Sequence, residues 1–192
     1  MKKIFSILVA AFAFAMVHDF DRACASAAGI PLSAYAGKFA ITSQGSQTYC
    51  FTSDFSALES CSTTGAVTAD GNVVAVGEEA IDASGNACAT LTGTVSFGLS
   101  KLPPTVTTFH SVVKVTNYHV NTSTGDTSFT DYSGGSCVGA TFNSSGATIT
   151  ATGTQHFAGS AGGSHIDALN TTLVDTLGSV SAFNVVLSAL KQ

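Results

Sequence analysis

The stretch Cys88–Phe97, CATLTGTVSF, alternates apolar and hydroxyl-bearing residues one by one. Successive side chains of a β-strand point to opposite faces, so this period of two predicts a strand that is buried on one face only. Threonines would point to solvent from such a strand. The buried face would carry Ala89, Leu91, Gly93, Val95 and Phe97, and the other face Cys88, Thr90, Thr92, Thr94 and Ser96.

The same alternation recurs along most of the chain, whereas helical periodicity is almost absent. We predict an all-β fold: a single antiparallel β-barrel of roughly 8–11 strands with lipocalin-like architecture, the alternative being a β-sandwich. The long run 106–120 and the scarcity of charge favour the barrel. Asp54–Ser60 is expected to form a short helical turn. Predicted strands cover 37–43, 47–53, 62–68, 73–81, 88–97, 106–120, 127–132, 137–142, 147–157, 165–175 and 181–190.

Two similar tetrapeptides, ADGN at 69–72 and ASGN at 83–86, bracket the apolar run Val73–Ile81. Their acidic and amide side chains could be metal ligands, but Gly and Asn also supply the backbone conformation that tight turns require. The second tetrapeptide lacks the spacing of a calcium loop. We therefore predict a turn at each tetrapeptide.

The N-terminus has the layout of a secretory signal peptide, with Lys2 and Lys3 followed by the apolar run Ile4–Val17. We predict cleavage after Ala27, which leaves one domain at 28–192. A lipoprotein anchor at Cys24 is the alternative. The protein is expected to be secreted or periplasmic, or displayed on the cell surface, and bacterial.

Four cysteines remain after this cleavage, and an oxidising compartment favours two disulfides. Three pairings are open. The hypothesis adopted here joins Cys50 to Cys61 and Cys88 to Cys137.

Cleavage also leaves four lysines and no arginine against ten acidic residues, a net charge of −6. This balance argues against nucleic acid and anionic membranes as partners. No segment after the signal is apolar enough to cross a bilayer as a helix, and no cofactor is expected.

Several motifs resemble those of small secreted bacterial all-β proteins of uncharacterised function. They are G-x-F at 37–39, TADGN, DASGN, LTGTVSF, HIDALNTTL and FNVVLSALKQ, which together extend over most of the chain after residue 27. The resemblance implies export and a β fold but no chemistry. Lipocalins and avidins share the predicted architecture; the chain has no tryptophan, so no site is carried over from either family.

Glu78 and Glu79 are adjacent in a predicted strand and must point to opposite faces. One of them would face the barrel interior, where a carboxylate needs a partner. The hypothesis pairs it with Lys114, midway along the longest strand, to bind a polar ligand. The alternative places Lys114 on the outer face.

A two-residue hairpin at Ser160-Ala161 would bring His156 directly opposite His165. Two imidazoles at that separation could hold a metal ion. The alternative leaves both rings on the solvent face.

We expect a non-catalytic barrel that binds a small apolar molecule. The second hypothesis is a structural or surface protein that self-associates by strand addition, through 28–43 or an edge strand. An enzyme that uses the histidines or the Glu/Lys pair is the third. The candidate lining or core residues are Phe39, Tyr49, Phe51, Leu91, Val95, Phe97, Val113, Phe142 and Phe157.

Overall fold

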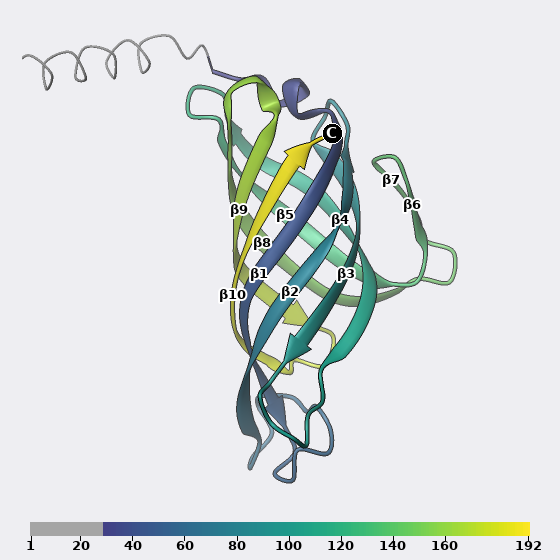
Figure 1. Cartoon of the computed structure of the whole chain (residues 1–192), viewed down its shortest axis with the longest axis vertical. Coiled ribbons are helices and arrows are strands. Elements are labelled where there is room, and N and C mark those ends of the chain that lie inside the picture. The colour runs from purple at the N-terminus through teal and green to yellow at the C-terminus, as the bar shows by residue number, and fades with distance from the viewer. Residues whose placement is uncertain (1–28) are drawn as a thin grey trace, which may run out of the picture.

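The structure is a computed structural model that describes residues 29–192, and eight of its strands form a closed antiparallel barrel (Figure 1). The predicted barrel is confirmed, and the sandwich alternative is wrong. The predicted signal peptide and the Cys24 anchor lie outside the described residues. The barrel strands are β1 (Gly37–Phe51), β2 (Val67–Ile81), β3 (Asn86–Ser96), β4 (Thr105–His119), β5 (Thr124–Ser133), β8 (Thr148–Gly159), β9 (His165–Asp175) and β10 (Val180–Lys191).

Strand β1 closes the barrel because it is paired along both edges. It pairs with β2 from Gly37 opposite Ile81 to Phe51 opposite Val67. Its other edge pairs with β10, beginning at Phe39 opposite Lys191. Around the barrel the order is β1, β10, β9, β8, β5, β4, β3 and β2.

Strand β1 runs straight through Gly45, where the sequence predicts two separate strands. Gly45 faces the backbone of β10 so closely that a Cβ atom there would lie 2.1 Å from the Asn184 carbonyl oxygen. The glycine therefore allows two strands to approach closely and does not form a turn.

The predicted turn at 69–72 is also wrong, because ADGN lies within β2. Asp70 points outward and accepts a hydrogen bond from Thr48 Oγ1 at 2.5 Å. Gly71 points inward, and a Cβ atom there would lie 2.9 Å from the ring of Phe97. An aromatic ring packed over a glycine is a known device for stabilising a strongly curved strand.

The second tetrapeptide does form a turn, between β2 and β3. One carboxylate oxygen of Asp82 accepts hydrogen bonds from the backbone N–H groups of Ser84 and Asn86, at 2.8 and 2.9 Å. Gly85 adopts φ +81°, which favours glycine. Asp82 is thus a turn residue.

The N-terminal residues 29–36 plug the upper end of the barrel in Figure 1. They include the short 3-10 helix η1 (Leu32–Tyr35), whose Tyr35 is 1% exposed and packs into the core. The Lys191 ammonium donates to the Ala34 carbonyl at 3.0 Å and lies over the Phe39 ring. We call the upper end of the barrel, which residues 29–36 close, the plug end. Tyr35 is part of the buried core, whose other members are Phe39, Ile41, Ala75, Ala89, Leu91, Phe157, Ile166, Ala168 and Ala189.

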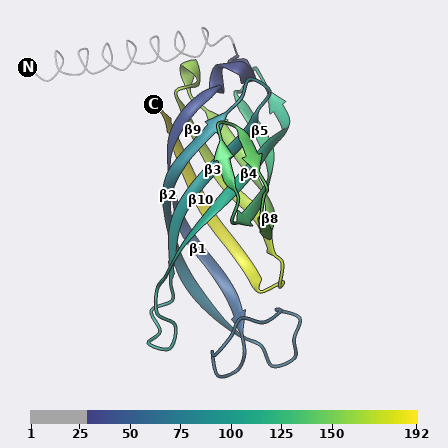
Figure 2. The same ribbon diagram turned by 90° about the vertical axis from the view of Figure 1, so that its right-hand side faces the viewer.

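A hairpin of β6 (Ser136–Val138) and β7 (Thr141–Asn143) lies outside the barrel over β3, where the sequence predicts one strand (Figure 2). The Cys88–Cys137 disulfide ties it to β3, as hypothesised. Phe142 therefore packs outside the barrel, with its ring 4.5 Å from that of Tyr132. Its predicted place in the lining or core of the barrel is wrong.

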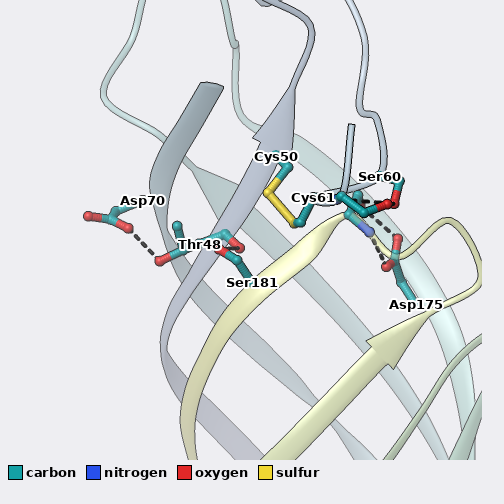
Figure 3. The surroundings of a disulfide bond; sticks show 9 residues. Thr48, Cys50, Ser60, Cys61, Asp70, Asp175 and Ser181 are labelled. Carbon is teal, nitrogen blue, oxygen red and sulfur yellow. Dashed lines mark hydrogen bonds between the residues drawn. A yellow bond between two sulfur atoms is a disulfide. The ribbon is translucent and has the colours of Figure 1, made fainter. Parts of the chain in front are cut away.

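The opposite end of the barrel, which we call the loop end, carries residues 52–66, 97–104 and 176–179. The hypothesised Cys50–Cys61 disulfide is present there (Figure 3). The disulfide joins the end of β1 to the loop 52–66, and the backbone N–H groups of Cys50 and Cys61 donate hydrogen bonds to the carbonyls of Ser179 and Gly178 in the neighbouring turn. Asp54–Ser60 forms turns and not the predicted helical turn.

Candidate functional site

Two adjoining chambers lie inside the barrel. The lower chamber, toward the loop end, has a volume of about 490 Å³, and the upper chamber, under the plug end, about 70 Å³. They adjoin because they share four lining residues. These are Leu91, Ser111, Gln155 and Leu187.

The wall of the lower chamber is mainly apolar. Two of its polar side chains are hydrogen-bonded within the wall: the Gln155 amide donates to Asn170 Oδ1 at 3.0 Å, and the Asn170 amide donates to the Val185 carbonyl at 3.1 Å. Such a wall would hold an apolar molecule and orient it through few polar contacts. Its apolar members include Val73, Ala75, Leu91, Val95, Phe109, Phe129, Val185 and Leu187.

Asp131 places a carboxyl group on this wall. It follows Phe129 by two residues in β5 and therefore points to the same, inner side. Ser111 lies directly opposite on β4 and donates a hydrogen bond to it. Burial raises the pKa of Asp131 to about 6, although the Ser111 hydrogen bond acts in the opposite direction.

Glu79 places a second carboxyl group in the upper chamber. It points inward from β2, between Phe39 and Ala89 on the neighbouring strands, whereas Glu78 is exposed on the outer face. Within residues 29–192 no side chain or backbone group donates a hydrogen bond to its carboxylate, and burial raises the pKa of Glu79 to about 7. Its accessible surface faces the chamber that it lines.

A buried hydroxyl without a partner lies on the same chamber. Thr127 is 6% exposed, and among residues 29–192 its Oγ1 has no hydrogen-bond partner. Buried polar atoms are nearly always satisfied, so such an atom beside a cavity indicates a place for water or a ligand.

An aromatic cluster lies where the lower chamber meets the loop end. The ring of Phe97 is 5.6 Å from that of Tyr49 and 5.3 Å from that of Phe51, in edge-to-face contact. Tyr49 donates a hydrogen bond to the inward-facing Gln47. Burial raises the pKa of Tyr49 to about 12, with a smaller contribution from the negative charge of Asp175. The cluster forms part of the chamber's border, Tyr49 lining it directly.

The hypothesised pair of an inward glutamate and Lys114 does not form. Glu79 is the inward glutamate, but Lys114 lies exposed on the outer face of β4, opposite Asn86 and Ser128. The pairing is therefore wrong, because the wall of the barrel separates the two charges.

The hypothesised histidine pair does not form either. The turn between β8 and β9 contains the 3-10 helix η2 (Ala161–Gly163), which shifts the register so that His156 faces Leu169 and not His165. His156 pairs with Asp126, and His165 Nε2 lies 2.9 Å from Asp167. No cluster of three metal-ligating side chains occurs in the described part of the chain.

The remaining predicted lining residues are distributed over the interior. Phe157 and Val113 line the upper chamber, and Val95 lines the lower one. Phe39 is fully buried in the core, with 0% exposure. Phe97 and Phe51 belong to the aromatic cluster.

A larger and more open hollow of about 960 Å³ lies against strands β2, β1, β10, β9, β8 and β5. A transverse row of outward side chains contributes to it, running from Val74 through Gln44, Val186 and Leu169 to His156 and Asp126. Val74, Val186 and Leu169 are 53%, 46% and 43% exposed. In this row Val186 and Leu169 are neighbours on adjacent strands, and Gln44 separates them from Val74.

No family model, curated protein sequence or solved structure matches the chain. Among residues 29–192, no helix has the length and apolar character needed to span a membrane.

Asp131, Thr127 and Ser111 were not among the sequence candidates. The signal for Asp131 is present in TSFTDYS at 127–133, where period two places it on the same face as Phe129. A single carboxylate at the end of a short strand gives no other indication that it points inward.

Proposed function

We propose that the protein is an exported, non-catalytic barrel that binds a small, mainly apolar molecule in the lower chamber. The observation that carries this proposal is the chamber of about 490 Å³ inside a closed barrel. Pockets for small molecules have roughly 300–1,000 Å³. A barrel of eight strands is wide enough for one small ligand.

Export is part of the proposal. Both disulfides join cysteines of the described chain, and such bonds persist in oxidising compartments. The predicted signal peptide supports the same compartment.

A naphthylamine probe that fluoresces in apolar surroundings tests the proposal. N-phenyl-1-naphthylamine would be titrated into the protein purified from its exported fraction. We expect saturable binding of one probe per chain, with displacement by apolar molecules.

Two neighbouring valines of β2 give matched variants. Val73 lines the lower chamber, whereas Val74 is 53% exposed on the outer face. Val73→Trp fills the chamber and should weaken probe binding at least tenfold, while Val74→Trp should leave it unchanged. Weaker binding in Val74→Trp alone would place the probe in the outer hollow and contradict the proposal.

The second candidate is a structural or surface protein that self-associates. The exposed aliphatic side chains of the outer row favour it, because exposed apolar patches are often contact surfaces. Strand addition through β1 is blocked, since both of its edges are paired. Light scattering after size-exclusion chromatography tests this candidate, and a monomer at high protein concentration would count against it.

A further inference from the structure

The charged side chains that face the interior are acidic. Three strands contribute carboxyls: Glu79 from β2, Asp131 from β5 and Asp175 from β9. No histidine, lysine or arginine lines either chamber in the described part of the chain. Lys191 lies near the upper chamber, but its ammonium donates to the Ala34 carbonyl at the plug end. Strands β3 and β8 place no titratable side chain on either chamber. The other inward titratable groups are the hydroxyls of Tyr35, Tyr49 and Tyr118.

These carboxyls differ in how far the protein satisfies them. Asp175 accepts hydrogen bonds from the backbone N–H and the hydroxyl of Ser179, at 2.6 and 2.7 Å. Asp131 receives one hydrogen bond, from Ser111, and Glu79 receives none. The two chambers thus present carboxylate oxygens with few donors to match them, and the Thr127 hydroxyl, which can both donate and accept, has no partner among residues 29–192.

Ser111 lies between Asp131 and Glu79, the two carboxyls with the fewest hydrogen bonds. It lies between Ala89 and Asp131 in one transverse row of the sheet, and Ala89 in turn lies beside Glu79. It also lines both chambers. A group bound at Asp131 in the lower chamber would therefore have Glu79 three strands away in the same row, beyond Ser111 and Ala89.

We propose that the ligand is an organic amine, with an apolar body in the lower chamber and a protonated nitrogen that donates hydrogen bonds to Asp131, Glu79 adding its negative charge from the upper chamber. This inference rests on the proposed function and names its ligand class. An ammonium carries three donors and no acceptor, which matches carboxylates that lack donors. An anionic ligand would face charges of its own sign, and an alcohol would supply a single donor.

Acidification should weaken this interaction. Burial raises the pKa values of Asp131 and Glu79 to about 6 and about 7, so both groups are mostly ionised at pH 8 and mostly neutral at pH 5. An alkylamine is cationic at both pH values. The amine therefore loses its ionic partners at pH 5, whereas an alcohol loses none.

The test uses three probes with the same ten-carbon chain: decylamine, 1-decanol and decanoate. Each would displace N-phenyl-1-naphthylamine from the full exported protein at pH 8 and at pH 5. We expect decylamine to bind at least tenfold more tightly than 1-decanol at pH 8, and decanoate to bind most weakly. At pH 5 the ratio of amine to alcohol affinity should fall to about two or less.

Three variants identify the group responsible. Asp131→Asn should reduce the amine preference at pH 8 at least fivefold, and Glu79→Gln should reduce it by a smaller factor. Glu78→Gln is the matched control, because Glu78 is exposed on the outer face, and it should leave the preference unchanged. The pH comparison uses the unmodified protein and does not depend on the folding of any variant.

Two outcomes would overturn the inference. Equal affinities for decylamine and 1-decanol at pH 8 would reject the amine and leave the proposed function standing. An amine preference that survives in the variant with both Asp131→Asn and Glu79→Gln would place the amine elsewhere. Failure of every probe to bind would instead reject the proposed function itself.

Discussion

At the plug end Tyr35 is 1% exposed and fills the barrel from above, whereas at the loop end the lower chamber reaches Leu58 and Leu177, which are 42% and 49% exposed. The same eight strands run through both ends. The difference comes from what the chain adds to them. A segment packs inward at one end, and at the other a loop is held to β1 by a disulfide and to the turn 176–179 by backbone hydrogen bonds. Stability should therefore be concentrated at the plug end, and access at the loop end.

The largest expected effect is that of Tyr35→Ala, which removes a buried ring from the plug end. Gly159 lies directly against this ring, so the cavity cannot collapse from that side without moving β8. Losing a buried aromatic side chain costs about 3 to 5 kcal/mol of unfolding free energy. Urea denaturation would measure this cost.

Phe55→Ala is the matched change at the loop end. Phe55 is only half-buried, with its ring 5.8 Å from that of Phe51. Its loss should cost about 1 kcal/mol. Equal costs for the two variants would contradict the proposed difference between the ends.

The next effect concerns pH. Burial raises the pKa of Glu79 from the ordinary 4.5 to about 7, so its ionisation in the folded protein costs about 3 kcal/mol. The free energy by which the neutral Glu79 carboxyl favours the folded protein is fully present below pH 4.5 and is lost as the pH rises through 7.

Glu79→Gln removes this dependence. Relative to the unmodified protein, the unfolding free energy of Glu79→Gln should increase by about 3 kcal/mol between pH 4 and pH 8, because the variant does not lose this stability. Denaturation at both pH values measures it, with Glu78→Gln as the control. A constant difference across this range would show that Glu79 titrates normally.

The last comparison is between the two disulfides. Cys50 and Cys61 are 11 residues apart, and replacing both by Ser should cost about 2 to 3 kcal/mol. Cys88 and Cys137 are 49 residues apart, so their replacement should cost about 1 kcal/mol more. A larger loss from the shorter loop would indicate that the Cys50–Cys61 bond also holds the β9–β10 turn in place.

The sequence predicts the strands well where one face is apolar and the other carries threonine, as in Cys88–Phe97. The prediction of turns fails at one of two similar glycines. Gly85 forms a turn, whereas Gly71 lies under the ring of Phe97 within a strand. The local sequence of the two is nearly the same. Only the ring contributed by a distant part of the chain distinguishes them.

The candidate site is predictable only in part, for a related reason. Adjacent glutamates guarantee that one faces inward, and Glu79 does. Lys114 follows two adjacent valines, Val112 and Val113, which lie on opposite faces of β4. Two apolar residues in succession obscure the period of two, so the sequence does not show which face Lys114 occupies. The histidine pairing failed because one short 3-10 helix, η2, changed the register of a whole hairpin.

The pairing of β1 with β10 also determines when the barrel can form. Phe39 and Lys191 are neighbours in the closed wall, although about 150 residues separate them along the chain. Until β10 has been synthesised and has paired, β1 has only one neighbour. During that interval one edge of a 15-residue strand is unpaired, so folding is slow and the nascent chain is most exposed to aggregation. A shortened chain without β10 would keep this vulnerability permanently.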